Sequence, residues 1–155
     1  MYVLNNETGE KQKATISKIG PGEIAKINKS KRFDFNWNKE KLFKVYKLTI
    51  DEIDDPIGLL SLNERHADYA MEIRLLASSK ENIGRLQKYR RIAGCLIAFA
   101  CKEAFKAGFE GFVCLRPKTL LEKYYIKKYG FKSTKLFLVS EGKNSLKLIR
   151  EYDEG

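Results

Sequence analysis

Apolar and polar residues alternate in the first half of the chain, and this period of two predicts β-strands. Residues 42–50 (LFKVYKLTI), 57–64 and 69–77 follow one another, with an acidic turn at 51–56 and a polar turn at 65–68. Strands joined by such short polar turns pair with their sequence neighbours. The pattern therefore predicts an antiparallel meander of three strands.

An earlier strand is predicted at 13–19 (KATISKI), where the same alternation stops at Gly20, Pro21 and Gly22. Proline suits the first turn of a helix, because its missing N–H has no intrahelical partner at that position. We therefore predict a short helix at 21–29.

The second half of the chain changes to longer apolar segments. After a polar loop at 78–91, residues 92–108 predict a helix that Gly108 closes. Its first ten residues are apolar on all sides, so both faces must be covered. The remaining elements predicted are a strand at 109–117 that stops at Pro117, an amphipathic helix at 118–129 capped by Gly130, and a hairpin that pairs 135–140 with 145–151.

The order of these elements predicts one mixed α/β (α+β) domain over residues 1–155. Its sheet is expected to be mixed and mostly antiparallel and to be flanked by helices, with one right-handed crossover through the first long helix. The sequence shows no repeat and no linker that would divide it.

The net charge of +10 is concentrated in residues 80–132, which hold 13 Lys and Arg against four Asp and Glu. Residues 1–79 hold 13 against 12, and residues 133–155 hold four of each. Two interpretations fit this surplus. It is either a solvated basic face or a binding surface for a polyanionic ligand, which would be a nucleic acid or a phosphorylated cofactor.

The three cysteines Cys95, Cys101 and Cys114 lack CxxC spacing, so we predict buried, reduced thiols and no bound metal. A nucleophilic cysteine would need the single histidine, His66, as its base, which argues against that chemistry. No apolar run is long enough to cross a membrane, and the first residues lack the order of a signal peptide. We therefore expect a cytoplasmic protein without a membrane partner.

The loop before the long helix places Lys88, Arg90 and Arg91 directly ahead of the small residues Ala93 and Gly94. The first turn of a helix has unpaired N–H groups and the positive end of the helix dipole, so it binds phosphate where the backbone is accessible. Many helices begin after basic loops, and the signal alone is not specific.

Three segments around this loop resemble the GNAT superfamily of acyl-CoA-dependent N-acetyltransferases. The family's pyrophosphate motif reads Q/R-x-x-G-x-G/A, and KYRRIAGCLI places Lys88 in the Q/R slot, Arg91 in the first glycine slot and Ala93 in the last slot. AMEIRLLASS resembles the family's fourth strand, and LLEKYYIKKYGFKS resembles the segment that ends in Gly-Phe. The resemblance covers about residues 40–135 and implies an acetyltransferase with acetyl-CoA as its co-substrate.

The resemblance also implies which residues hold acetyl-CoA. Arg91 departs from the family, since it brings a bulky side chain where glycine allows close backbone approach. That side chain either turns outward to contact a phosphate or spoils the pocket, and the crowding of cations from Lys80 to Arg91 makes us expect binding. The residues implied are Leu75, Leu76 and Ala77 for the pantetheine arm, and Arg85, Lys88, Tyr89, Arg90, Arg91, Ile92, Ala93 and Gly94 for the phosphates.

Direct acetyl transfer needs a base that takes a proton from the attacking amine. Similarity to the histone-type enzymes of the family places this base at Glu72, and burial among Tyr69, Met71 and Ile73 would raise its pKa. The alternative is a strand carboxylate that faces solvent or pairs with a basic neighbour such as Arg74.

The leaving thiolate benefits from an acid, which the family supplies as a tyrosine ahead of the Gly-Phe pair. The commonest slot holds Ile126 here, and one extra residue in the segment moves Tyr125 into place, with Tyr124 as the second candidate. The alternative for either tyrosine is packing against the sheet or the cofactor. His66 is a less favoured base. Trp37 and its aromatic neighbours in RFDFNW are candidates for an acceptor pocket or for the core.

The acceptor implied is a primary amine on a small molecule or peptide, without further identity. A nucleic-acid-binding module is the alternative suggested by the charge, and it is not favoured because no RNP, zinc-finger or helix-turn-helix pattern occurs. A GNAT fold without catalysis and an acceptor attached to RNA also stay open. The edge of the predicted C-terminal hairpin offers a place for homodimer pairing.

Overall fold

A computed structural model describes residues 1–51, 53–116 and 121–153 of the chain. In this part nine strands form one sheet, and only one neighbouring pair, β5 with β7, is parallel. The mixed, mostly antiparallel sheet expected from the sequence is therefore confirmed. The strands, in their order across the sheet, are β6 (Tyr89–Arg90), β1 (Tyr2–Asn5), β2 (Lys11–Ile19), β3 (Lys44–Ile50), β4 (Ile53–Arg65), β5 (Ala70–Ser78), β7 (Val113–Leu115), β9 (Leu138–Ser140) and β8 (Lys132–Ser133).

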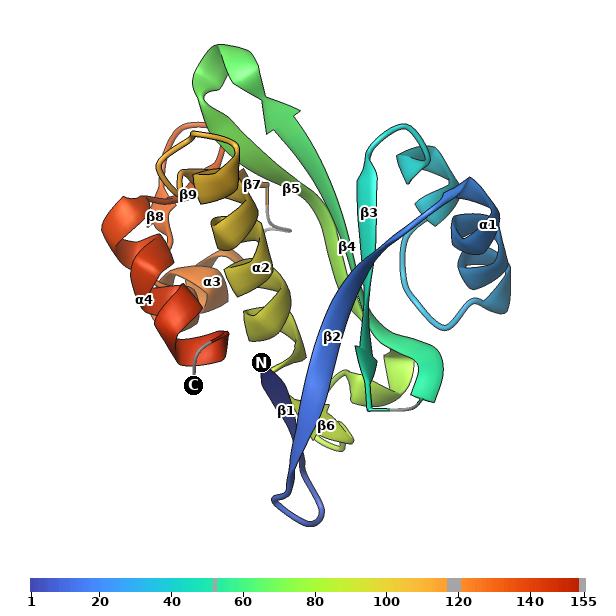
Figure 1. Cartoon of the computed structure of the whole chain (residues 1–155). Helices are drawn as coiled ribbons and strands as arrows, with labels where there is room; N and C mark the ends of the chain where they lie inside the picture. Colours follow the sequence, from blue (N-terminus) through green and yellow to red (C-terminus); the bar gives the residue numbers. More distant parts are fainter. Residues whose placement is uncertain (52, 117–120, 154–155) are drawn as a thin grey trace.

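Helices cover both faces of this sheet (Figure 1). One face carries α2 (Ile92–Lys106), α3 (Glu122–Tyr129) and α4 (Gly142–Tyr152), and the other carries α1 (Pro21–Ser30). Single 3₁₀ turns follow α1, β4 and β5: η1 (Trp37–Glu40), η2 (His66–Asp68) and η3 (Lys80–Asn82). No helix in the described ranges is long and apolar enough to span a bilayer.

Each face of the sheet has its own apolar core. On the α2 face, Leu60 and Met71 of the sheet pack with Leu96 and Ile97 of α2 and with Leu148 of α4. Because α2 is enclosed by the sheet on one side and α4 on the other, its apolar residues are buried all round, as its sequence required. A smaller core on the α1 face is built around the fully buried Trp37.

The predicted meander is present, with β4 longer than the alternation indicated and β3 shorter, since β3 begins only at Lys44. β4 begins at Ile53, so residues 53–56 of the expected acidic turn belong to a strand, while residue 52 lies outside the described residues. The helix expected at 21–29 is α1. β1 and β6, for which the sequence predicts no element, pair with each other and extend the sheet at one end.

The C-terminal hairpin is the clearest error of the sequence analysis. Residues 138–140 form β9, which pairs with β7 and β8, but residues 142–152 form helix α4 rather than a strand. Ser145, Leu148, Ile149 and Tyr152 are buried at spacings of three and four, which is the period of a helix. The hairpin edge that was expected to pair with a second copy therefore does not exist.

The strand expected at 109–117 is also shorter, because the turn after α2 continues through Gly111. Glu110 and Gly111 both have positive φ, and the Phe109 N–H donates to the Ala104 carbonyl, so β7 begins only at Val113. Gly108 ends α2 in a left-handed conformation as expected. Residues 117–120 lie outside the described part, and the helix expected from 118 is α3 from Glu122, capped by Gly130.

Candidate active site

A cavity of about 610 Å³ lies where β5 ends, between the loop that follows it, the first turn of α2, and helix α3. The end of α4 and part of the segment after α1 complete its walls. Segments far apart in the sequence thus meet at one place. From the residues expected to hold a cofactor, the cavity brings together Leu76, Ala77, Tyr89, Arg90, Arg91, Ile92 and Ala93.

The cavity opens because β5 and β7 stop pairing halfway along β5. Their last pair is Ile73 with Leu115, whereas β5 stays paired with β4 as far as Ser78. The register of β5 against β4 shifts at the same point, and Arg74 is the extra residue of this bulge. Bulges bend a strand and increase its twist. Beyond the bulge, the edge of β5 faces the cavity instead of a strand.

The first turn of α2 presents backbone N–H groups to the cavity. The first helical hydrogen bond of α2 runs from the Cys95 N–H to the Arg91 carbonyl, so the N–H groups of Ile92 and Ala93, which line the cavity, precede it. Such groups carry the positive end of the helix dipole. This end of the cavity is therefore suited to an anion.

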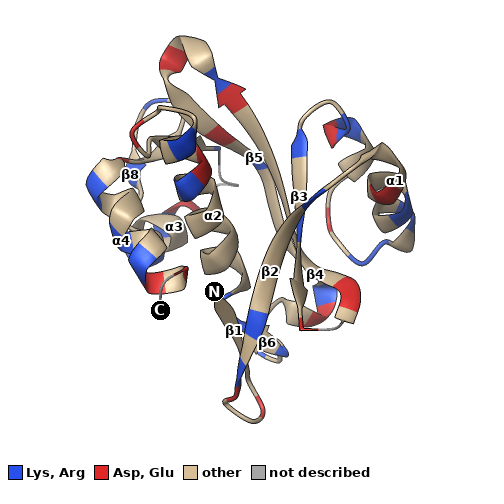
Figure 2. Ribbon diagram, viewed as in Figure 1, with Lys and Arg blue, Asp and Glu red and all other residues tan. Residues whose placement is uncertain are grey.

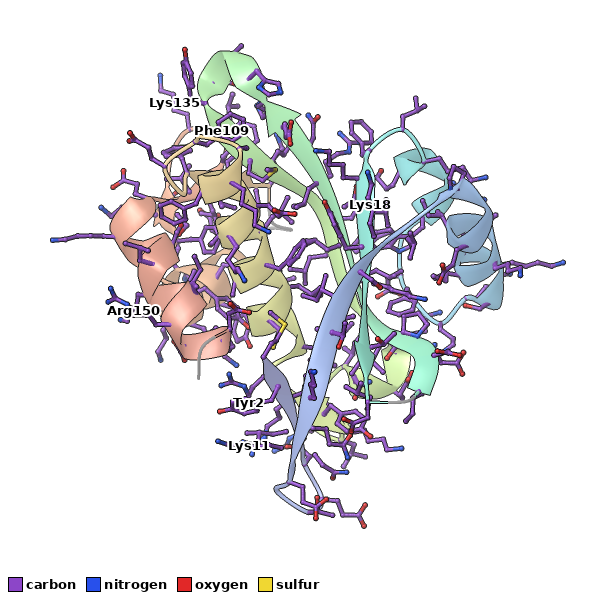
Figure 3. The ribbon with its side chains drawn as sticks, viewed as in Figure 1. Tyr2, Lys11, Lys18, Phe109, Lys135 and Arg150 are labelled. Atoms are coloured by element: carbon purple, nitrogen blue, oxygen red, sulfur yellow. The ribbon has the colours of Figure 1, made fainter. Side chains whose placement is uncertain are left out.

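Arg91 adopts the backbone conformation that glycine favours, with φ of 80° and ψ of 3°. Its guanidinium lies between two rings, with its central carbon 4.0 Å from the centroid of Tyr2 and 4.8 Å from that of Tyr152. It also donates hydrogen bonds to the main-chain carbonyls of Tyr2 (3.2 Å) and Glu151 (2.9 Å). The side chain is therefore held by β1 and α4, and Figure 3 shows Tyr2 beside the start of α2.

Gly94 faces the C-terminal helix. A Cβ at this position would lie 2.1–2.5 Å from ring atoms of Tyr152, so only glycine lets α2 and α4 approach this closely. Tyr152 in turn lines the cavity. Gly94, which the sequence predicts to bind the cofactor, is thus required for the packing of α2 against α4.

The other residues expected from the sequence lie around the cavity rather than in its wall. Leu75 points to the α1 face and packs against the core there. Arg85 and Lys88 are exposed on the loop, with the Lys88 ammonium 5.7 Å from the ring of the buried Tyr89. These two cations flank the loop side of the cavity.

The loop between β5 and α2 is fixed by a buried residue that the sequence analysis missed. Asn82 donates to the Ser79 hydroxyl (2.9 Å) and accepts the Tyr89 N–H (2.8 Å), and it is 3% exposed. It also lines the cavity. An asparagine in a polar loop carries no sequence signal of burial, which is why it was not identified.

Tyrosines form the wall opposite β5. Tyr124, Tyr125, Tyr129 and Tyr152 all line the cavity, with centroid separations of 5.8–6.2 Å between neighbouring rings. Burial, and then the neighbouring Tyr124, raise the pKa of Tyr125 above its usual value. Burial likewise raises the pKa of Tyr152 to about 12. Tyr129 and Tyr152 were missed, Tyr152 because its helix was expected to be a strand.

Glu72 lies on β5 before the bulge and on the face opposite α2. The Asn63 amide donates to its carboxylate at 3.3 Å, and Arg65 Nη1 is 3.8 Å from the same oxygen. The expected burial among Tyr69, Met71 and Ile73 is wrong, because strand alternation sends Met71 and Ile73 into the α2 core while Tyr69 is 71% exposed. The Glu72 side chain retains 13% exposure.

Arg74, expected as an alternative partner of Glu72, pairs with Glu40 instead. Its Nε donates to a Glu40 carboxylate oxygen at 2.8 Å, and the same oxygen accepts the Ser61 hydroxyl at 2.8 Å. The guanidinium also stacks 3.7 Å from the centroid of Phe43. The bulge residue thus ties β5 to the segment that follows α1.

The remaining candidates separate into core, cavity and surface. Trp37 is 1% exposed and its indole N–H donates to the Asp34 carbonyl, so it belongs to the core. Phe35, from the same aromatic segment, lines the cavity. His66 lies at the exposed tip of the β4–β5 hairpin, where its Nε2 is 3.2 Å from a Glu64 oxygen.

The cations of this region lie on both sides of the cavity. Lys80, Arg85, Lys88 and Arg90 are exposed on the β5–α2 side, and Lys128 of α3 lines the opposite wall. Figure 2 marks the Lys and Arg positions along these elements. Part of the positive charge counted in residues 80–132 therefore lies at the cavity, whereas Lys102, Lys106 and Lys132 lie elsewhere on the surface.

Comparison with family models and with curated protein sequences finds no match. Solved structures do match the fold. An IAA acetyltransferase from Bacillus cereus ATCC 14579 has a TM-score of 0.57 at 18% identity and covers 79% of both chains. AtaT complexed with acetyl-methionyl-tRNAfMet has a TM-score of 0.56 at 14% identity, and the match covers 88% of this chain and 99% of the AtaT chain. An N-acetyltransferase from Staphylococcus aureus Mu50 has a TM-score of 0.52 at 12% identity, and the match covers 82% of this chain and 94% of the other. The chain therefore shares the fold of N-acetyltransferases.

Proposed function

We propose that this chain is one GNAT-type acetyltransferase domain, over residues 1–155, that transfers an acetyl group from acetyl-CoA to a primary amine. The observation that carries the proposal is the separation of β5 from β7 after the Ile73–Leu115 pair, which opens the edge of β5 into the cavity at the start of α2. An extended ligand can pair with that edge while its anionic end meets the helix N-terminus.

Acetyl-CoA fits this arrangement because it combines an extended amide arm with phosphates. The edge of β5 at Leu76 and Ala77 would pair with the arm, and the N–H groups of Ile92 and Ala93 would receive the pyrophosphate. Exposed cations on the loop, among them Arg85 and Lys88, would attract the remaining phosphate charge. The free, buried cysteines suit a reducing compartment such as the cytosol.

Arg91 would bind through its backbone rather than its side chain. Its guanidinium already donates to two main-chain carbonyls and stacks on two rings, so moving it to a phosphate would break four contacts. The left-handed backbone at this position performs the role that glycine has in the family motif.

For the chemistry, we assign the base to Glu72 and the acid to Tyr125, with Tyr124 second. The amine nitrogen forms a bond to the thioester carbonyl carbon and the carbon–sulfur bond breaks. The amine proton passes to the Glu72 carboxylate, and the tyrosine hydroxyl protonates the CoA thiolate. The Tyr125 hydroxyl is protonated at neutral pH, as a proton donor must be, and burial, which raises its pKa, further favours this form.

Calorimetric titration with acetyl-CoA tests binding, and release of free CoA thiol over a panel of amines tests transfer. Wild type is expected to bind acetyl-CoA and to acetylate at least one class of amine. Glu72→Gln is expected to lower kcat about 10²-fold or more with unchanged acetyl-CoA affinity, whereas Glu7→Gln, on the exposed turn after β1, serves as the matched control.

Each failure has a different meaning. Absence of acetyl-CoA binding at high micromolar concentration would overturn the proposal. Binding without transfer to any amine would indicate a GNAT fold that only binds. Salt-dependent RNA binding without acetyl-CoA binding would favour a nucleic-acid module.

A further inference from the structure

Three arginines lie within two residues of Glu72 or of its strand partners in the register of β4, β5 and β7. Arg65 comes from the end of β4, Arg74 from the bulge of β5, and Arg116 directly follows β7. The register aligns Glu72 with Cys114, and Arg116 is two residues further along the same face. The charges of these side chains act on the nearby Cys114 thiol. Burial and the Glu72 carboxylate raise the pKa of this thiol, and Arg65 and Arg116 lower it.

Two of these arginines are already neutralised by close carboxylates. Arg65 holds Asp68 at 2.7 Å, and Arg74 holds Glu40 at 2.8 Å. Glu72 accepts the Asn63 amide at 3.3 Å, and the one cation within 4.0 Å of it in the described part of the chain is Arg65, at 3.8 Å, which also pairs with Asp68.

Arg116 is different, because among the described residues no carboxylate lies within 4.0 Å of its guanidinium. The Arg116 guanidinium lies over the ring of Phe137, with its central carbon 4.8 Å from the ring centroid. Arg65 lies over the same ring at 5.1 Å. A planar guanidinium on an aromatic ring keeps its N–H fork available for a carboxylate or phosphate.

The position of Arg116 relates it to the candidate cavity. The last β5–β7 pair is Ile73 with Leu115, so Arg116 stands at the point where the two strands separate. Glu72 precedes this point by one residue on β5. The Glu72 carboxylate and a guanidinium with no carboxylate partner among the described residues therefore flank the place where the edge of β5 becomes accessible.

We propose that the acceptor is an amine that carries an anionic group, a carboxylate or a phosphate, within a few bonds of its nitrogen, and that Arg116 binds this group. This inference rests on the proposed acetyl transfer at the same site. A zwitterionic acceptor complements the two charges, with its nitrogen toward Glu72 and its anion toward Arg116. A polyamine or an aminoglycoside carries only positive charges, so the Arg116 guanidinium would repel it.

Paired acceptors test this directly: glycine against glycinamide, and phosphoethanolamine against ethanolamine. The two pairs distinguish carboxylate from phosphate as the preferred anion. Wild type is expected to show kcat/KM at least about tenfold higher for the anionic member of one pair. Arg116→Gln is expected to remove that preference chiefly through KM, and Arg116→Lys to restore part of it.

Arg150→Gln is the matched control, because Arg150 is an exposed cation on the outer side of α4 (Figure 3) and should leave the preference unchanged. Acetyl-CoA affinity should be the same in all four proteins. Equal kcat/KM for charged and neutral acceptors, or a preference that survives in Arg116→Gln, would overturn the inference while the proposed transfer could still stand.

A binding measurement separates this inference from the proposed transfer. Titration of the CoA complex with N-acetylglycine and with N-acetylglycinamide requires no turnover, and N-acetylphosphoethanolamine against N-acetylethanolamine repeats it for phosphate. The anionic member of one pair should bind wild type about tenfold more tightly than its neutral analogue and lose that advantage in Arg116→Gln. If neither pair shows this difference, the assignment of Arg116 is wrong, whatever the enzyme acetylates.

Discussion

The guanidinium of Arg91 stacks on the ring of Tyr2, 4.0 Å from its centroid, and donates to the Tyr2 carbonyl at 3.2 Å. This contact joins the first strand of the chain to the first turn of α2, and the further hydrogen bond to Glu151 extends it to the last helix. Arg91 thus links the N- and C-terminal segments to the first turn of α2, beside the cavity. The family motif has glycine at this position, so this contact distinguishes the chain from that pattern.

Replacing Arg91 by glycine should lower the stability of the fold but leave acetyl-CoA binding nearly unchanged. Glycine relieves the positive φ, which costs about 1 kcal/mol for other residues, but it removes two charged hydrogen bonds and two stacking contacts. We expect the free energy of unfolding to fall by roughly 1–2 kcal/mol and the acetyl-CoA Kd to change less than about threefold. Urea denaturation and calorimetry measure the two effects.

Arg91→Lys provides the control, since it keeps the charge and the strained backbone but cannot make the same planar contacts. It should be at least as destabilised as Arg91→Gly. A large loss of acetyl-CoA affinity in the glycine variant alone would show that the guanidinium itself holds a phosphate.

Gly94→Ala should destabilise the protein by about 1–3 kcal/mol, because the new methyl group overlaps the Tyr152 ring and must push α4 away. Since Tyr152 lines the cavity, the variant should also weaken acetyl-CoA binding. Thermal unfolding and calorimetry check both effects. Gly22→Ala is a suitable comparison, because a Cβ in this turn of α1 meets nothing within 4 Å and should be neutral or slightly stabilising.

Tyr125→Phe should reduce kcat by about 10- to 100-fold while leaving acetyl-CoA affinity nearly unchanged, because it removes a proton donor and keeps the ring that packs near Phe131. Steady-state kinetics and calorimetry give the two quantities. Tyr124→Phe, on the more exposed neighbour, should have the smaller effect. If the two variants behave in the opposite order, Tyr124 is the acid, and unchanged rates in both would remove the assignment.

Stability should decrease in alkaline solution. Burial raises the pKa of the Cys95, Cys101 and Cys114 thiols from 9.0 to about 11. Between these values the unfolded chain releases protons that the folded chain retains, so the free energy of unfolding falls as pH rises from 9 to 11. For each thiol, the free energy of unfolding falls by roughly 2–3 kcal/mol in total by the pH at which the thiol is ionised in both the folded and the unfolded chain.

Urea denaturation with a reductant at pH 8, 9, 10 and 11 measures this dependence. Cys101→Ala should lower stability at pH 8 but show a shallower decline above pH 9. A free energy of unfolding that is the same at pH 8 and pH 11 would contradict buried, protonated thiols.

The sequence was most informative where one physical requirement dominated a long segment. The meander follows from alternation, α2 follows from a run of apolar residues that has to be covered on both sides, and the caps follow from Gly108 and Gly130. Residues 145–151 were assigned to a strand because a short segment such as SLKLIRE fits both periods, and only packing against α2 selects the helix.

The sequence by itself determined the fold class and the excess of cations in residues 80–132, because these depend on local pattern and composition. It also predicts a phosphate site at the segment before α2. Only the tertiary structure decided which side chains face the cavity. The packing of α2 on the face that carries Met71 and Ile73 leaves Glu72 on the opposite face, and the contacts with Tyr2 and Glu151 fix where the Arg91 side chain lies. Both depend on partners distant along the chain, whose approach no local pattern encodes.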